Sequence, residues 1–171
     1  MTLTMNSNLE RLRKELEGAM AGSTPTELAS GPEGKWSPAQ VLEHLWLTYK
    51  NTSKGLSKCL EKGAPLATRA TFIHRVKTFV VVRLKYLPAG AKAPERATPR
   101  GTPSSEVLRS FFSEIQQMDS GLTECERKFG TTTKILDHPV LGPLTVNQWR
   151  TFHWVHGRHH ARQIRERLER A

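Results

Sequence analysis

The chain has 171 residues, two cysteines and a formal net charge of +10. This length can bury a core without disulfides or a structural metal, so we expect one domain covering residues 1–171. The two cysteines form no paired motif, and no apolar run is long enough for a signal-peptide core or a membrane span. The sequence therefore predicts a cytoplasmic protein with no membrane partner.

Two helices in the first half of the chain are predicted from their start signals. The first begins at Ser7, has Glu10 as its capping partner, and repeats leucines at helical spacing until a glycine stops it. The second begins at Ser37, with a proline at its first position and Gln40 as its capping partner. It is expected to run to about residue 62, where another glycine follows.

The middle of the chain alternates between apolar segments and long connections. Residues 71–87 fit a helical period, although the valines at 80–82 would also suit a strand, and we predict an extra helix here. A proline-rich connection leads to a third long helix at about 102–130, which carries a sustained apolar stripe. Residues 131–144 are expected to form a second long connection.

The fourth long helix begins at Thr145, has Gln148 as its capping partner and is expected to continue to the end of the chain. Its arginines lack interleaved aromatic residues or a helix-turn-helix pattern, which argues against a nucleic-acid partner. Four long helices with two extended connections predict an all-α fold. The expected architecture is a four-helix bundle of crossover topology, with one extra helix between the second and third bundle helices.

Four of the seven histidines lie within residues 153–160. His156 and His160 are four residues apart, so they project from one helix face at a spacing that suits a single metal ion. His44 on the second helix would add a third imidazole and leave coordination positions open. Each alone would be interpreted as a hydrogen-bonded core histidine, but their joint occurrence favours a metal site. His153 is the main rival ligand.

Polar residues continue this histidine seam along both helices. A polar seam inside an apolar bundle requires a hydrogen-bonded network or a ligand, so these residues are candidates for supporting contacts or pocket walls. Gln163 would orient a ligand or cap the seam, and His159 would donate to a ligand or stand exposed beside it. The other candidates are Gln40, Thr48 and Asn51 on the second helix and Trp149 and His153 on the fourth.

Two tryptophans, Trp46 and Trp154, are predicted to face away from the seam. They would mark a dimer surface, but an isolated exposed tryptophan or a contact with the extra helix explains each of them equally well. A homodimer is therefore one option that the sequence leaves open.

The chain resembles the DinB-like superfamily of metal-binding four-helix bundles. The resemblance rests on WSPAQVLEHL at 36–45, HPVLGPLTVNQW at 138–149 and HGRHHARQI at 156–164, and it spans most of the chain. It implies His44, His156 and His160 as ligands of a divalent metal ion, usually nickel or zinc. The extra segment and the proline-rich connection depart from the superfamily pattern and could cover the mouth of the bundle, which would change the substrate.

Members of this superfamily include enzymes that use small thiols as nucleophiles, and many that have no assigned activity. The leading hypothesis is a metal-dependent enzyme acting on a small-molecule substrate, either a thiol S-transferase with a low-molecular-weight thiol as cosubstrate or a hydrolase. No conspicuous inward carboxylate offers itself as general base, which favours a thiolate that needs none. The alternative is a non-catalytic, stress-associated bundle that binds metal.

Overall fold

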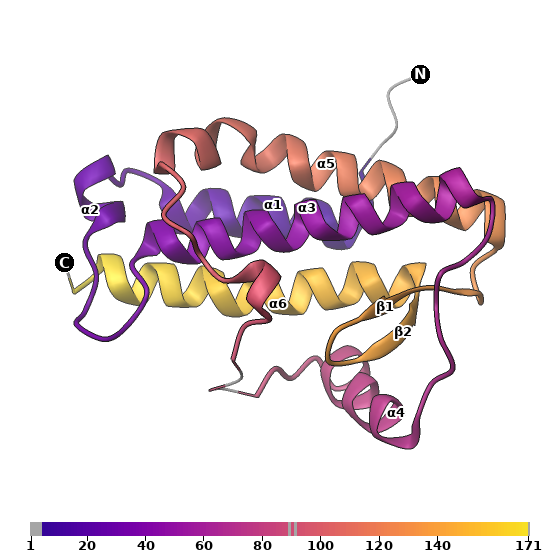
Figure 1. Ribbon diagram of the computed structural model, residues 1–171. Helices are drawn as coiled ribbons and strands as arrows, with labels where there is room; N and C mark the ends of the chain where they lie inside the picture. The colour runs from indigo at the N-terminus through magenta and orange to yellow at the C-terminus, as the bar shows by residue number, and fades with distance from the viewer. Residues whose placement is uncertain (1–4, 89, 91, 171) are drawn as a thin grey trace.

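The computed structural model describes residues 5–88, 90 and 92–170. Its centre is formed by four long helices, which lie side by side in Figure 1. They are α1 (Ser7–Met20), α3 (Pro38–Lys62), α5 (Ser104–Phe129) and α6 (Val146–Leu168). The predicted, mainly helical fold is confirmed. In the described part of the chain, no helix has both the length and the hydropathy needed to cross a membrane.

The four helices are joined by one long connection, residues 63–103, and by two shorter ones, residues 21–37 and 130–145. In Figure 1, α1 and α6 run in one direction, whereas α3 and α5 run in the other. Helix α3 packs mainly on α5, its parallel neighbour, and α1 packs mainly on α6. Because parallel neighbours need a return path, residues 63–103 travel back along the bundle before α5 begins. We call residues 63–103 the crossover.

The crossover contains three short helical segments. They are α4 (Phe72–Thr78), the π-helical turn η1 (Phe79–Arg83) and the 3-10 turn η2 (Glu95–Ala97). The predicted helix at 71–87 is therefore present but ends earlier. A further short helix, α2 (Pro25–Ala29), joins α1 to α3 and was not predicted.

Residues 131–144, expected to form a connection without secondary structure, contain a β-hairpin. Strands β1 (Lys134–His138) and β2 (Gly142–Thr145) pair antiparallel, with Leu136 opposite Leu144. The hairpin buries Ile135 and Leu144, which gives this segment an apolar side on the bundle. The all-α prediction is therefore incomplete, since one small sheet accompanies the helices.

Most helix starts follow their predicted caps. Capping boxes formed by Ser37 with Gln40 and by Thr145 with Gln148 open α3 and α6 as expected. The start of α1 differs, because the side chain of Asn6 accepts the hydrogen bond from a backbone N–H of the first turn. Gln40 is exposed, and its Oε1 accepts from the backbone N–H of Ser37 at 2.8 Å. It was predicted as a pocket residue, but the cap uses its side chain.

Helix α6 is buried on two faces, because α1 packs on it as well as α3 and α5. Ala161, which lies away from His156 on the helical wheel, is fully buried. A Cβ at Gly157 would lie 2.0 Å from Leu12 Cδ1, which shows how closely α1 approaches. Trp46 and Trp154 are also buried, so the prediction that they could form an exposed dimer surface is wrong.

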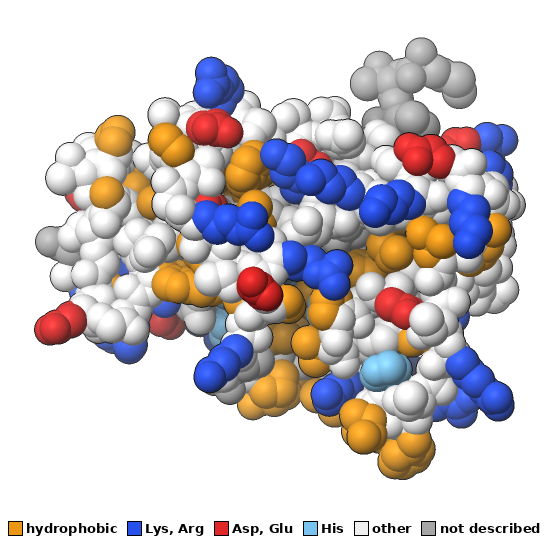
Figure 2. Space-filling model, viewed as in Figure 1, with side chains coloured by type: hydrophobic (Ala, Val, Ile, Leu, Met, Phe, Trp, Pro, Cys, Tyr) orange, Lys and Arg blue, Asp and Glu red, His pale blue; other side chains and the backbone are white. Residues whose placement is uncertain are grey.

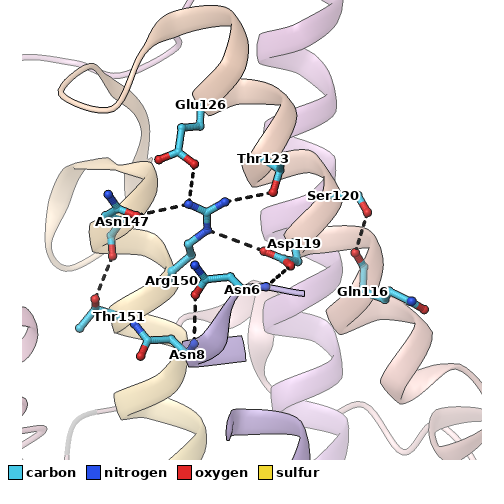
Figure 3. Close-up of polar contacts among 10 residues, drawn as sticks. All are labelled: Asn6, Asn8, Gln116, Asp119, Ser120, Thr123, Glu126, Asn147, Arg150 and Thr151. Carbon is cyan, nitrogen blue, oxygen red and sulfur yellow. Dashed lines mark hydrogen bonds and ion pairs between the residues drawn. The ribbon is translucent and has the colours of Figure 1, made fainter. Parts of the chain in front are cut away.

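A buried ion cluster joins α6 to α5 at the end near the hairpin (Figure 3). The Arg150 guanidinium donates to Glu126 Oε2 at 2.7 Å and to Thr123 Oγ1 at 3.0 Å. Its Nε lies 3.7 Å from Asp119 Oδ1, and the other oxygen of this carboxylate accepts from the backbone N–H of Asn6 at 2.8 Å. The start of α1, the middle of α5 and the start of α6 are therefore held together by one guanidinium group.

Candidate metal centre

Three histidines from two helices converge in the interior of the bundle. Nε2 of His156 lies 3.2 Å from Nε2 of His44 and 3.1 Å from Nε2 of His160. All three ligand atoms lie within 4.8 Å of one another, and all three residues are buried. A tetrahedral ion with metal–nitrogen bonds near 2.0–2.1 Å separates its ligand nitrogens by about 3.3 Å. The three side chains are therefore close enough to hold one metal ion.

Hydrogen bonds on the opposite ring nitrogens fix the protonation of two imidazoles. Nδ1 of His44 lies 2.8 Å from the carbonyl oxygen of Ala97, and a carbonyl can only accept. Nδ1 of His160 lies 2.9 Å from Oε1 of Gln163, which also accepts. Both rings thus carry their proton on Nδ1. Their Nε2 lone pairs face His156, as a metal ligand requires.

Burial keeps these rings neutral at physiological pH. Desolvation lowers the pKa of His44, lowers that of His156 well below its usual range, and lowers that of His160 to about 3. The neighbouring imidazoles add to the effect, since a charge on one ring disfavours a charge on the next. The lone pairs are therefore not lost to protonation at neutral pH.

The other two histidines of α6 lie outside this group. His153 is fully buried, stacks on Trp149 with 5.5 Å between ring centroids, and has no hydrogen-bond partner among the described residues. It is thus packed in the core behind the site. His159 is less buried, and its Nε2 lies 3.0 Å from Nε2 of Gln163. Gln163 therefore bridges His159 and His160 through the two ends of one amide.

The histidines open onto a cavity of about 810 Å³. Of the sequence candidates, Thr48, Asn51 and Trp149 line it, as do His159 and Gln163. The Thr48 hydroxyl donates to the carbonyl oxygen of His44 at 2.8 Å, whereas the Asn51 amide donates to the carbonyl oxygen of Arg96 at 3.0 Å. Both side chains thus support the wall of the cavity, one through α3 and one through the crossover.

Several contributors to the site escaped the sequence analysis. The Ala97 carbonyl is a backbone group of η2, so no side-chain pattern could reveal it. Glu43, beside His44, is buried and accepts hydrogen bonds from the N–H groups of residues 100–102 and from the Thr102 hydroxyl. Burial raises the pKa of Glu43, but these bonds outweigh it and leave the pKa lowered. Glu43 thus anchors the crossover that carries Ala97.

Two residues of the hairpin also line the cavity. Asp137 is the one carboxylate among the described residues that line it, and its Oδ1 accepts from the backbone N–H of Thr68 at 3.0 Å. His138 accepts two backbone N–H groups of the hairpin turn at Nδ1, and burial lowers its pKa to about 4. The sequence analysis found no inward carboxylate, so Asp137 was not anticipated.

The Gln163 bridge predicts a measurable effect on metal affinity. Gln163→Leu keeps the side-chain volume but removes the acceptor that holds the proton on Nδ1 of His160. We expect this variant to bind zinc or nickel about 10–100-fold more weakly, as is typical when the hydrogen-bond partner of a metal ligand is lost. Competition with a chromogenic chelator measures this change. Arg162→Gln on the exposed side of the same turn is the control, and equal affinities would contradict the bridging role.

Comparison with known proteins gives a family but no function. No curated protein and no solved structure matches the chain. One family model does match, over residues 23–167, which include all three converging histidines, the hairpin and the crossover. Its description is "Protein of unknown function (DUF1569)". Since the match covers most of the sequence, the chain belongs to the DUF1569 family.

Proposed function

We propose that the protein is a cytoplasmic enzyme of the DinB-like superfamily that depends on a divalent metal ion and acts on a small molecule. The ligands would be His44, His156 and His160. The observation that carries this proposal is the convergence of three Nε2 atoms, two of which have no proton to share. The crossover that separates the parallel helices α3 and α5 supports a DinB-like topology.

A satisfied histidine network fits this geometry poorly. A proton on Nε2 of His156 can be donated to His44 or to His160, but one proton makes only one good hydrogen bond. The remaining contact would leave two nitrogen lone pairs facing each other at 3.1 or 3.2 Å in a buried site. A cation at the centre of the three nitrogens removes this repulsion. The donor set supports a metal ion over a hydrogen-bonded network.

The chemistry of the donors favours nickel or zinc. Imidazole nitrogens are preferred by these ions, whereas magnesium and calcium require several oxygen ligands. When bound by three imidazoles, such an ion supplies a Lewis acid with open positions and lowers the pKa of water or of a thiol. Gln163 does not fill a fourth position, because both ends of its amide contact histidines. Because Gln163 is held in this way, a coordination position stays open, which favours catalysis over the alternative of a non-catalytic metal-binding bundle.

The cavity walls indicate what the residues of this chain do for a substrate. Trp36, Val80 and Phe152 contribute apolar surface beside the histidines, which excludes water and favours an apolar small molecule. Asp137 offers a carboxylate, so hydrolysis with a general base remains available beside thiol transfer. We expect the substrate to bind with its reacting group toward the three imidazoles and its apolar part toward the crossover wall.

Cobalt substitution tests the proposal directly. Protein loaded with Co²⁺ is expected to show visible absorption bands of a four- or five-coordinate ion, and these bands should shift when azide or a small thiol is added. A shift means that exchangeable positions exist, as catalysis requires. Stoichiometric binding with bands that do not respond to either probe would instead identify a closed site and the non-catalytic alternative. Absence of binding would reject the metal site itself.

A further inference from the structure

The crossover exposes a cluster of large apolar side chains. Figure 2 shows orange groups at the lower right, where Figure 1 places α4. We call this cluster the crossover patch. Its members, with their exposed fractions, are Phe72 (79%), Ile73 (61%), Val76 (47%), Phe79 (56%), Leu84 (58%) and Tyr86 (60%). Among the described residues, Val140 is the one other large hydrophobic side chain of comparable exposure. Exposed apolar side chains gathered in one place mark an interaction surface.

The charged residues of the segment that carries the crossover patch all have one sign. Residues 62–94 contain seven lysines and arginines and no aspartate or glutamate. Four of these cations, Arg75, Lys77, Arg83 and Lys85, are exposed and interleave with the apolar side chains. Among the residues that the structure describes, none of the four forms an ion pair with a carboxylate. This surface therefore suits a partner that is both apolar and negatively charged.

The arrangement along α4 is that of a helix lying on an interface. At 100° per residue, Phe72, Val76 and Phe79 fall within roughly 60° of arc. Arg75 lies about 40° beyond one edge of this stripe, whereas Ile73 and then Lys77 lie about 60° and about 100° beyond the other edge. Both cations are exposed, and their long side chains can reach outward past the apolar groups. The opposite side holds the buried Thr78, whose hydroxyl donates to the carbonyl oxygen of Leu141 at 3.1 Å. Helix α4 thus packs on the hairpin and presents its apolar stripe outward.

From this surface we infer that the crossover patch docks the protein onto an anionic phospholipid membrane. Aromatic and aliphatic side chains would enter the boundary between headgroups and acyl chains, and the flanking cations would pair with lipid phosphates. Lysines and arginines near an anionic membrane are attracted to its surface, so four cations favour binding before any side chain inserts. The inference departs from the expectation of no membrane partner and does not depend on the metal site.

A second copy of the chain suits this surface less well. In a two-fold symmetric dimer, the same patch would face itself, so the four cations would meet four identical cations. The crossover patch contains no carboxylate to offset that repulsion. A bilayer of acidic lipids supplies both the apolar phase and the missing negative charge. Val76 and Lys77 also line the cavity that holds the histidines, so docking would place the cavity wall at the membrane.

Vesicle sedimentation tests the inference with the full chain. We expect the protein to sediment with vesicles that contain phosphatidylglycerol, and to stay in solution with vesicles of phosphatidylcholine alone. High salt should weaken the binding because it screens the cations. The variant Phe72→Ser/Ile73→Ser is expected to partition at least about tenfold more weakly, since it removes two large apolar side chains that would insert. Arg75→Gln/Lys77→Gln should lose affinity and much of the salt dependence.

A charge-matched control separates the patch from the general positive charge. Lys54→Gln/Lys58→Gln removes two exposed cations from α3 and should bind vesicles as the wild type does. Equal losses of vesicle binding in Arg75→Gln/Lys77→Gln and in Lys54→Gln/Lys58→Gln would overturn the inference. Failure of the wild type to bind anionic vesicles would also overturn it. A concentration-dependent dimer that the Phe72→Ser/Ile73→Ser variant abolishes, without vesicle binding, would assign the patch to a second copy instead.

Discussion

Replacing His156 with alanine is expected to reduce the metal content of the purified protein from about one ion per chain to background. His156 is the central member of the site, because its Nε2 contacts the Nε2 atoms of both other histidines. Loss of one direct ligand should weaken binding by more than the roughly 10–100-fold cost of losing an outer hydrogen-bond partner. Elemental mass spectrometry on untagged protein measures the content, and His44→Ala and His160→Ala should behave alike.

His153→Phe is the matched control for this experiment. His153 lies one turn before His156 on the same helix, is fully buried, and makes no hydrogen bond within the described structure. Phenylalanine preserves its stacking on Trp149, so the variant should keep its metal. Retention of full metal content by His156→Ala would refute the ligand assignment, and loss of metal in His153→Phe alone would make His153 the ligand. Far-UV circular dichroism verifies that the helices persist.

Replacing Arg150 with methionine is expected to lower the free energy of unfolding more than any other single substitution that removes an ion pair. The change leaves Asp119 and Glu126 without the guanidinium that contacts both of them. Removing one partner of a buried ion pair costs about 3–5 kcal/mol. The lower end applies, because the Glu126 side chain is 25% exposed. For a chain of this size, about 3 kcal/mol corresponds to a fall in Tm of roughly 6–12 °C.

Arg127→Met provides the comparison, because its ion pair lies within α5 alone. Arg127 contacts Glu124 on the exposed side of α5, and such surface pairs contribute about 0–1 kcal/mol. Differential scanning calorimetry of both variants at one pH and salt concentration separates the two cases. Similar Tm values for the two variants would mean that the Arg150 cluster of Figure 3 contributes no more than a surface pair.

The helix starts were predictable because capping is a local interaction. Thr145 and Gln148 are three residues apart, so the sequence alone places them within reach of each other. The same locality explains why His156 and His160 could be paired from their spacing. Gln40 was wrongly predicted to line the pocket, because two local patterns gave different roles for its side chain. Helical spacing placed it in line with His44, whereas the capping box required it to bond the backbone N–H of Ser37. The cap prevailed.

Features that depend on distant segments were not predictable. The hairpin contains prolines at 139 and 143, which suggested a loop, but a two-stranded sheet tolerates proline where no ladder donor is needed. Ala161 has arginines beside it in the sequence, and only the approach of α1 shows that it is buried. The bond from His44 to the Ala97 carbonyl joins residues 53 positions apart, and a backbone carbonyl has no sequence signature.

The position of Ala97 determines the order in which the site can assemble. His44 and the neighbouring Glu43 are both held by the far end of the crossover, through Ala97 and residues 100–102. Closing this chain segment of about forty residues costs entropy and is slow relative to local helix formation. The helices can thus pair before the imidazole of His44 is oriented. We therefore expect a metal ion to bind only after the crossover has docked, and a bound ion would then hold the crossover in place.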